Sequence, residues 1–418
     1  MEQLRCSPLS FTIQPFSMKN LNIFLFICLS NIYSLNAQKN KKGSEREFNS
    51  AEKTFDIVYQ NGKAETLTYS RGNYAKALPL FLDLYKQDST NMNLAFKLGV
   101  CYLNSSTERI RSIYYLNKAV DSVSVDYKET SYKERNTPLI AYNFLGDAYH
   151  LNFQFDKAIT AYKKYITLLS ENKDPDKAIL AETNRKIEMC KTGKRLLTNP
   201  IKIKIENLGD SINSSYPDYS PVLSADQNTI FFTSRRPSST GGQKDDEGNY
   251  FEDIYIATKT ETGWSQALNI GPPIDTDEHE ATVGLSPDGQ TILIYKDDLG
   301  DGNIYTTTLK GDEWSTPIKL NENINSKYWE PCAAISADGN ILYFASDRPG
   351  GFGGRDLYTS KRTPKGDWAV AVNMDSTINT PYDEDSPFIH ADGVTLSFSS
   401  NGQTTMGGFD IFTSQLSE

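Results

Sequence analysis

The sequence predicts a multidomain protein of the α plus all-β class, in which a solenoid of helical hairpins is followed by a β-propeller. Three observations lead to this prediction: helical periodicity in the first half, a strand-rich unit that recurs about four times in the second, and a change in the sign of the charge between them. Residues 38–200 carry 26 basic and 19 acidic side chains, whereas residues 201–418 carry 15 and 33. Such an asymmetry is typical of two domains with different surroundings or partners.

The composition excludes several classes of protein. With 418 residues, of which 38% are hydrophobic and 23% charged, the chain is long enough for two or three domains and has an ordinary globular composition. This excludes a collagen, a wholly disordered chain and a membrane protein with many spans. The formal net charge of −10 also argues against a nucleic-acid partner, because nucleic-acid-binding proteins present a basic surface to phosphate.

Residues 1–37 have the pattern of a secretory signal peptide. The apolar stretch Leu21–Leu29 follows a lysine and precedes a small residue, and it is shorter than the ~20 apolar residues that span a bilayer. We expect translation to start at Met18 and cleavage to follow Ala37. The alternative is a buried strand or helix of the folded protein. Export predicts a mature chain without a transmembrane span, beginning with a linker at residues 38–49.

The five cysteines support neither a disulfide framework nor a zinc site. Ile27 precedes Cys28 where lipoprotein signals have a small residue, so we do not expect lipidation. The mature chain keeps three widely spaced cysteines, which are Cys101, Cys190 and Cys332. Their number is odd and no close Cys/His pairs accompany them. We expect the first two of them to be small buried side chains.

Residues 50–197 have the pattern of stacked helical hairpins. The motif L-G-x-x-Y occurs at Leu98–Tyr102 and again at Leu145–Tyr149, and a second helical pattern follows each copy. The two copies are 47 residues apart because of a polar stretch at Ser122–Thr137, which we predict to be a long loop. A helix from Lys177 to about Leu197 is expected to cap the stack.

These hairpins resemble tetratricopeptide (TPR) repeats. In that family, small residues let two antiparallel helices pack closely, and stacked hairpins form a concave surface. The resemblance implies a groove that binds a peptide or protein segment. The alternative is a scaffold whose groove binds no ligand, since architecture alone does not assign a partner. We expect His150, at the end of the second motif, to pack or cap and not to act as a ligand.

Residues 201–418 contain a unit that recurs every 50 to 62 residues. Each unit has an acidic residue, a turn six residues later, an apolar strand and a short D-I-Y-like segment, and the three complete copies end with a Trp. A four-stranded antiparallel blade accounts for this order, because the turn reverses the chain and the later segments favour strands. The pattern resembles TolB-type WD-like (PD40) repeats, which implies a propeller of about four blades.

The fourth unit stops before its Trp strand, whereas Ile201–Ile205 resembles the end of a complete unit. One expectation is therefore that this first strand of the domain completes the last blade. Such pairing would close the ring and cover an exposed sheet edge. A chain that is cut short is the competing explanation.

The strongest candidates for a site are the four repeated acids, Asp218, Glu280, Glu330 and Glu384. They precede the turn by six residues and so begin the innermost strand of each blade, where they would ring one mouth of the central channel. One hypothesis is that their focused negative potential binds a cation or a basic segment of a partner. The alternative is that each carboxylate serves local hydrogen bonding at the strand start and solubility.

Two loops are similar to known binding motifs without matching them. Gly350–Gly354 is glycine-rich like a phosphate loop, but it precedes a strand instead of a helix, so we expect a flexible connection. Asp297–Asn303 is acidic, but it lacks the ligand order of an EF-hand. This run is compatible with weak calcium binding, and no other cofactor is expected.

Catalysis has little support in the sequence. Neither His279 nor His390 lies in a G-x-S-x-G or H-E-x-x-H context. Acidic residues are abundant, but they recur once per unit, which is typical of a structural role and not of a single active site. We therefore expect a protein that is not an enzyme. The alternative is a propeller hydrolase that acts on a glycan, through paired carboxylates, or on a peptide.

The order of leader, TPR-like repeats and WD-like repeats resembles the N-terminal part of Bacteroidetes OmpA-family envelope proteins, some of which are associated with type IX secretion and gliding. The resemblance implies a scaffold in the periplasm, peripheral to the outer membrane, with envelope or secretion-system proteins as partners. In that family an OmpA-like peptidoglycan-binding domain follows the propeller. No such domain is present in this sequence, so we do not expect direct peptidoglycan binding. A truncated, non-functional paralogue is a further alternative.

Overall fold

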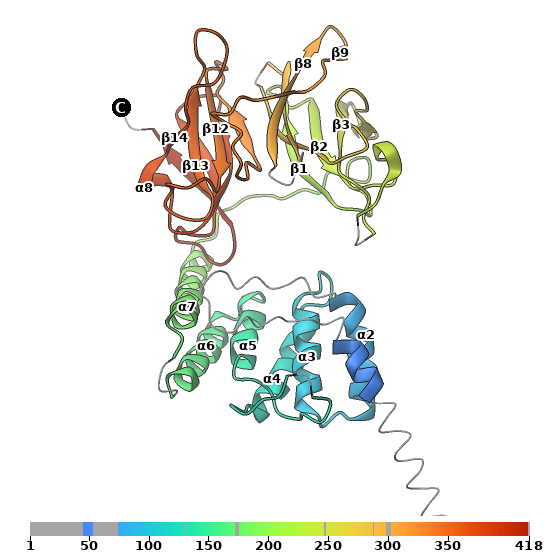
Figure 1. Ribbon diagram of the computed structural model, residues 1–418, viewed down its shortest axis with the longest axis vertical. Helices are drawn as coiled ribbons and strands as arrows, with labels where there is room; N and C mark the ends of the chain where they lie inside the picture. Colours follow the sequence, from blue (N-terminus) through green and yellow to red (C-terminus); the bar gives the residue numbers. More distant parts are fainter. Residues whose placement is uncertain are drawn as a thin grey trace, which may run out of the picture. The chain divides into compact units, whose positions relative to one another are not determined.

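The computed structural model describes residues 45–52, 74–129, 131–171, 175–245, 248–286, 288–297 and 302–416. The chain divides into two compact units, one up to Cys190 and one from Lys191 onwards. The first is helical and the second consists mainly of β-sheets (Figure 1). The predicted signal peptide, with its start at Met18 and its cleavage after Ala37, lies outside the described residues. No helix in the described ranges is both long and apolar enough to cross a bilayer.

The first unit contains helices α2 (Tyr74–Gln87), α3 (Met92–Leu103), α4 (Arg111–Ala119), α5 (Ala141–His150), α6 (Phe155–Ser170) and α7 (Lys177–Thr198), preceded by a helical segment at residues 45–52. Each helix from α2 to α5 packs on the helix that follows it in the chain. α3 packs on α4 and α5 packs on α6, so each L-G-x-x-Y motif begins a helical hairpin as predicted. The predicted capping helix is α7, and the predicted loop joins α4 to α5, with Val123 and Thr137 bridged across it.

Glycine sets the distance between the two helices of each hairpin. A Cβ atom at Gly99 of α3 would lie 2.5 Å from Leu116 Cγ of α4. A Cβ atom at Gly146 of α5 would lie 2.3 Å from Tyr162 Cε1 of α6. Carbon atoms in contact are normally about 3.5–4.0 Å apart. The close approach predicted from the motif is therefore confirmed at both positions.

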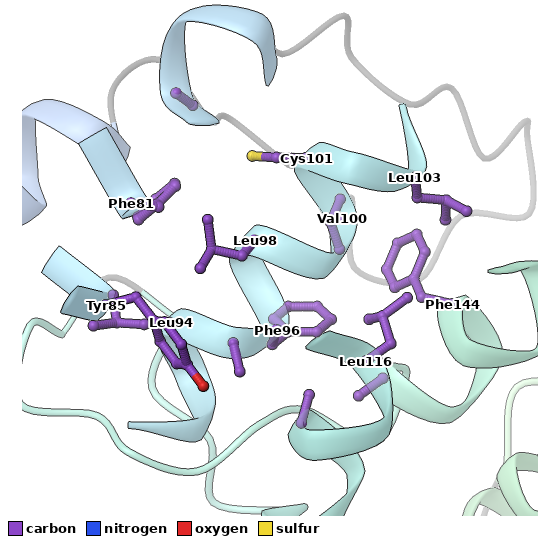
Figure 2. Packing of buried hydrophobic residues seen from close by; sticks show 14 of the residues in the cluster. Phe81, Tyr85, Leu94, Phe96, Leu98, Val100, Cys101, Leu103, Leu116 and Phe144 are labelled. Carbon is purple, nitrogen blue, oxygen red and sulfur yellow. The ribbon is translucent and has the colours of Figure 1, made fainter. Parts of the chain in front are cut away.

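One apolar core connects the hairpins (Figure 2). Phe96 of α3, Leu116 of α4 and Phe144 of α5 meet there, and the ring centroids of Phe96 and Phe144 are 5.9 Å apart. Cys101 is also buried in this core, and Cys190 is buried in α7, as predicted. The core is thus shared by successive helices and does not belong to one hairpin.

His150 and Cys332 both lie against neighbouring side chains. The ring of His150, at the end of α5, packs edge-on against Phe155 with the ring centroids 5.6 Å apart, which agrees with the expected packing role. Cys332 is half-buried and its thiol lies 2.8 Å from Asp385 Oδ1. All three cysteines in the described residues are free thiols.

The second unit contains four antiparallel sheets, one for each repeated unit of the sequence. The first sheet consists of β1 (Asp218–Leu223), β2 (Thr229–Ser234), β3 (Asp253–Thr260), β4 (Gly263–Trp264) and β5 (Leu268–Asn269). The second sheet consists of β6 (Glu280–Leu285), β7 (Thr291–Lys296), β8 (Asn303–Lys310), β9 (Glu313–Trp314) and β10 (Ile318–Lys319). The third sheet consists of β11 (Ala333–Ile335), β12 (Ile341–Ser346), β13 (Asp356–Lys361) and β14 (Val372–Asn373). The fourth sheet consists of β15 (Glu384–Ile389), β16 (Thr395–Ser400) and β17 (Asp410–Gln415), and a short helix, α8 (Asp375–Ile378), lies between the third and fourth sheets in the chain. These sheets are the predicted blades of a four-bladed β-propeller.

The same turn joins the first two strands of the blades. In the second blade, Ser286 Oγ donates to Asp288 Oδ1 at 2.5 Å and accepts the N–H of Thr291 at 2.9 Å. Gly289 completes this turn with a φ of 71°, a conformation that suits glycine. In the fourth blade His390 takes the place of the serine and lies 3.2 Å from Asp392, as the sequence indicated.

Buried side chains join each blade to the next. The first strands of the blades pack on each other in the order β1, β6, β11 and β15. Clusters that include Phe231 and Ile292, then Leu293 and Phe344, then Ala345 and Phe398, connect the successive sheets. Among the described residues, no such cluster connects the fourth blade to the first.

The predicted completion of the last blade by Ile201–Ile205 is wrong in this structure. These residues form no strand, and Ile201, Ile203 and Ile205 are 81%, 72% and 88% exposed. The sheet of the fourth blade ends on β17. Alternating isoleucines favour a strand, but a strand is stable only with a hydrogen-bonded partner. The resemblance of this region to the end of a repeated unit is seen further along the chain, where Ile212 is buried in the first blade.

Candidate functional site

The four repeated acids are buried and already bonded within their own blades. Glu280, Glu330 and Glu384 are 0% exposed, and the side chain of Asp218 is 9% exposed. Each carboxylate accepts hydrogen bonds from the backbone N–H and the hydroxyl of the residue four positions earlier. For Glu330 this residue is Ser326, at 3.0 Å from its N and 2.8 Å from its Oγ. The matching pairs are Ser214 with Asp218, Thr276 with Glu280 and Thr380 with Glu384.

A second partner completes this arrangement, which we call the clasp. Arg236 lies 2.7 Å from Asp218, Lys296 lies 2.6 Å from Glu280 and Arg348 lies 3.1 Å from Glu330. In the fourth blade the hydroxyl of Ser400 donates to Glu384 at 2.6 Å. None of the four carboxylates is therefore left free at a channel mouth. Each carboxylate thus has local hydrogen bonds, as in the second hypothesis, and the binding of a cation or a basic segment of a partner stays a prediction.

Next to three of the clasps, a backbone hydrogen bond joins neighbouring blades. The N–H of each clasp glutamate donates to the carbonyl of the residue just before the third long strand of the previous blade: Glu280 to Glu252 at 2.9 Å, Glu330 to Gly302 at 3.3 Å and Glu384 to Arg355 at 2.8 Å. The side chains at these junctions differ. The residue pairs are Glu252 with His279, Gly302 with Trp329, and Arg355 with Asp383. The repeat thus holds the backbone constant while the side chains vary.

A pocket of about 410 Å³ lies at the first two of these junctions. It is lined by residues of the first three blades, and β1 and β6 supply part of its wall. Its charged and aromatic lining residues are Tyr219, Arg235, Glu252, His279, Tyr295, Asp297 and Trp329. None of them is a clasp acid, and except for Asp297, which corresponds to Asp347, the residue types at the corresponding positions of the other blades differ. This pocket is the candidate functional site.

Glu252 is the centre of a polar network in the pocket. Its carboxylate accepts a short hydrogen bond from the Tyr219 hydroxyl, and it lies 3.1 Å from His279 Nδ1 and 3.3 Å from Arg235. Burial alone would raise the pKa of Glu252, but the hydrogen bonds from His279 and Tyr219 and the charge of Arg235 outweigh burial, so its pKa lies below the ordinary value. The network holds Glu252 as a carboxylate.

Replacing Glu252 with glutamine should destabilise the propeller unit in a pH-dependent way. Hydrogen bonds to a charged group contribute about 1.5–3 kcal/mol, so we expect a loss of that size at neutral pH. Because the pKa of Glu252 is lowered on folding, the advantage of the wild type is full above the unfolded pKa, about 4.3, and is lost as pH falls through the lower folded pKa.

Urea unfolding of both proteins between pH 3 and pH 7, followed by tryptophan fluorescence, measures this difference. All four tryptophans lie within residues 201–418, so the signal reports on the propeller unit alone. Glu261→Gln, at an exposed position, is the matched control. If the stability advantage of the wild type over Glu252→Gln grew as the pH was lowered, the assigned network would be contradicted.

Trp329 is an exposed aromatic residue held in place by the pocket. It is 40% exposed, its Nε1 donates to the Tyr295 hydroxyl at 3.2 Å, and the guanidinium of Arg355 lies 4.8 Å from its ring centroid. Gly302 makes room for this packing, because a Cβ atom there would lie 2.6 Å from Trp329 Cδ1. The ring is therefore ordered before any ligand arrives, which lowers the entropy cost of binding.

A second concave surface lies on the helical unit. A groove of about 510 Å³ is formed by α4, α5 and α6, and its lining residues include Tyr142, Leu145, Tyr149, Lys157 and Lys164. The hydroxyl of Tyr149 donates to Asn117 Oδ1 at 2.9 Å, which fixes the ring at the groove. Tyrosine rings beside lysine side chains suit an extended peptide with acidic residues.

The polar groups at the centre of the pocket are paired with one another. His279 Nδ1 is engaged by Glu252, but within the described residues no Ser, Thr or Cys side chain is hydrogen-bonded to His279, as a nucleophile would be. A glycosidase needs a carboxyl group with a raised pKa as its proton donor, whereas the pKa of Glu252 is lowered. His390 belongs to a turn of the fourth blade and is not a lining residue of this pocket.

The glycine-rich loop also has a structural role. The N–H groups of Phe352 and Gly353 donate to the Asp356 carboxylate at 2.6 Å and 3.1 Å. These amides are therefore used by the blade itself, as expected for a connection between strands. Most of the acidic run Asp297–Asn303 lies outside the described residues, and its predicted weak calcium binding stays a prediction.

Sequence reasoning did not find the pocket. It singled out the acids because they recur, whereas the pocket residues do not recur. A signal was present: the position before each acid reads Pro217, His279, Trp329 and Asp383, and such variation within an otherwise regular repeat marks positions that the blade itself does not constrain. Their meeting with Glu252 and Tyr219 depends on the packing of one blade on the next.

In comparisons with known proteins, no family model and no curated protein matches the chain. Among solved structures, TolB from Acinetobacter baumannii is similar with a TM-score of 0.34 and 17% identity, over 49% of this chain and 42% of that one. A protein from Agrobacterium tumefaciens described as a TolB has a TM-score of 0.29 and 15% identity, over 48% and 83%.

The similarity extends to proteins with other activities. An α-L-arabinofuranosidase from Lactobacillus brevis has a TM-score of 0.31 and 12% identity, over 47% of this chain and 72% of that one. The chain spans less than half of the Acinetobacter TolB. At these scores, neither the activity nor the partners of any of these proteins can be assigned to this chain.

Proposed function

We propose that this chain is an exported, non-enzymatic scaffold that binds protein partners in the periplasm, peripheral to the outer membrane, within an envelope or secretion assembly. The leader-like sequence at residues 1–37 supports export. Two helical hairpins, each with glycine at its contact, support a TPR-like first domain. The observation that carries the binding role is the pocket of non-repeated residues around Trp329.

Trp329 has the properties of an anchor for a polypeptide partner. Tryptophan, tyrosine and arginine dominate the energy of protein interfaces, and all three occur in this pocket. Arg235 and Glu252 already pair with each other, and His279 bonds to Glu252, so a partner can approach without leaving a buried charge unpaired. A segment with an aromatic or aliphatic side chain over Trp329 and polar contacts at the Glu252 network fits this surface.

The alternative function, hydrolysis of a glycan or a peptide, has one observation in its favour. Non-repeated polar residues converge on a single pocket, as they do in active sites. However, the two roles that hydrolysis requires, an activated nucleophile and a proton donor, are not filled by Glu252 and His279, which are paired with each other. Binding therefore accounts for the pocket better.

Replacing Trp329 with alanine should weaken capture of the partner at least tenfold. Loss of an anchor residue typically costs about 2 kcal/mol or more of binding free energy. The tagged chain would be used to capture proteins from a solubilised envelope fraction, with recovery measured by quantitative mass spectrometry. Val372→Ala, at an exposed position of β14 outside the pocket, is the control and should capture the same partner as the wild type.

The same experiment separates the two functions. Equal recovery of every envelope protein by wild type and Trp329→Ala would remove the binding role of the pocket. Hydrolysis of a glycan or peptide that required Glu252 would replace it with the enzymatic alternative. Tyr142→Ala on the helical groove tests the second surface independently, because α5 belongs to the other unit.

A further inference from the structure

Three carboxylates meet in the interior of the propeller, between the first and second blades. Asp253 begins β3, Asp275 lies in the turn that follows β5, and Glu280 begins β6. These residues are 0%, 1% and 0% exposed. One oxygen atom from each side chain lies within 4.8 Å of the other two. The pocket around Trp329 contains none of the three, so this cluster is a separate feature.

The other blade junctions have asparagine where this one has Asp275. The residues that correspond to Asp253, Asp275 and Glu280 are Asn303, Asn325 and Glu330 at the second junction, and Asp356, Asn379 and Glu384 at the third. Asn325 bonds to Ile304 twice, donating to its carbonyl and accepting its N–H, both at 2.8 Å. Asp275 accepts the N–H of Ile254 at 3.1 Å, but an ionised carboxylate has no proton to donate.

One oxygen of this cluster has no hydrogen-bond partner. Asp253 Oδ2 accepts from the N–H of Thr240 and from Asn269, both at 2.5 Å, whereas Asp253 Oδ1 is buried without a partner. A buried polar atom without a partner destabilises a fold by about 1–3 kcal/mol, and more if it is charged. The position of this oxygen among carboxylates indicates that a positive ion is its complement.

The charges of the cluster do not balance. Three carboxylates meet there, and among the described residues the only ion pair to any of them is that of Lys296 with Glu280.

We propose that Asp253, Asp275 and Glu280 bind one Ca²⁺ ion that links the first two blades. Carboxylate oxygens are the preferred ligands of hard divalent cations. Ca²⁺ holds oxygen at about 2.3–2.6 Å, so three oxygen atoms that lie within 4.8 Å of one another can reach a single ion. Mg²⁺ requires about 2.0–2.1 Å and a regular octahedron, which a site built from three fixed blade residues is less able to supply. This inference does not depend on the proposed function of the pocket.

Replacing Asp275 with asparagine tests the site with the residue that the other junctions already use. The full chain is freed of metal with EDTA and titrated with CaCl₂, and bound calcium is measured by equilibrium dialysis. We expect one tightly bound ion per wild-type chain, a higher urea midpoint of tryptophan fluorescence with calcium, and at least tenfold weaker binding by Asp275→Asn. Asp312→Asn, which removes an exposed carboxylate between β8 and β9, should bind like the wild type.

The proposed site would be overturned if Asp275→Asn bound calcium as tightly as the wild type. It would also be overturned if calcium left the urea midpoint of the wild type unchanged. Mg²⁺ binding as tight as that of Ca²⁺ would overturn the choice of ion. Circular dichroism in EDTA checks that Asp275→Asn is folded. If it is not, Asp253→Asn, which reproduces Asn303 of the second junction, provides the same comparison.

Discussion

Replacing Glu330 with alanine is expected to lower the free energy of unfolding of the propeller unit by about 3–5 kcal/mol. Glu330 is fully buried, accepts hydrogen bonds from Ser326 and Ser346, and pairs with Arg348 at 3.1 Å. The guanidinium of Arg348 is itself only 16% exposed, so removal of the carboxylate leaves a buried positive charge without its partner. The cost of that uncompensated charge dominates the expected effect.

Urea unfolding followed by tryptophan fluorescence measures this loss. Glu330→Gln keeps one carbonyl oxygen for the serine donors and should destabilise the unit less than alanine does. Glu322→Ala removes an exposed carboxylate from the same connection and should change the free energy of unfolding by less than about 0.5 kcal/mol. A Glu330→Ala protein as stable as the Glu322→Ala control would show that the clasp does not support the blade.

Replacing Gly146 with alanine is expected to destabilise the helical unit by about 1–3 kcal/mol. Alanine is the better helix former by about 1 kcal/mol, but its Cβ would lie 2.3 Å from the Tyr162 ring. That ring cannot move aside easily, because it is 0% exposed and its hydroxyl donates to Asp147 at 2.7 Å. Asp147 is held in turn by Lys186 of α7 at 2.7 Å. The steric cost therefore exceeds the gain in propensity.

Far-UV circular dichroism at increasing urea concentration measures this effect, because helices dominate that signal. Gly99→Ala is the matched comparison, and it should cost less since its neighbour Leu116 is a flexible aliphatic side chain. In a Tyr162→Ala background the ring is absent, so Gly146→Ala should become neutral or stabilising. A loss of the same size in both backgrounds would show that contact with Tyr162 is not the cause.

The regular parts of the fold could be predicted because they depend on short-range chemistry. The helical hairpins are indicated by the glycine in L-G-x-x-Y, which Gly99 and Gly146 need for the helix contact. The blades are indicated by the turn of Ser286 and Asp288, whose hydrogen bonds lie within five residues. Such features repeat in the sequence because each copy needs the same turn or the same close helix contact.

One expectation failed because it concerned a contact between distant segments. The residues Ile201–Ile205 have the alternation of a strand, but in the structure they have no strand beside them. The roles of the repeated acids also depend on distant contacts. Asp218, Glu280 and Glu384 begin β1, β6 and β15, and Glu330 precedes β11, but the sequence does not show which groups surround each carboxylate. For Glu330 these groups include Ser326 and Arg348.

Hydrophobic period, turn residues and glycine positions act over a few residues, so they are enough to predict helical hairpins followed by about four repeated β-sheet units. Which side chains meet depends on the tertiary fold. The pairing of Glu252 with His279, and of Asp253 with Asp275 and Glu280, joins blades that are separate in the sequence. Burial then sets the chemistry, since a carboxylate removed from water must find a proton, a cation or a donor, and which of these it finds depends on its neighbours in space.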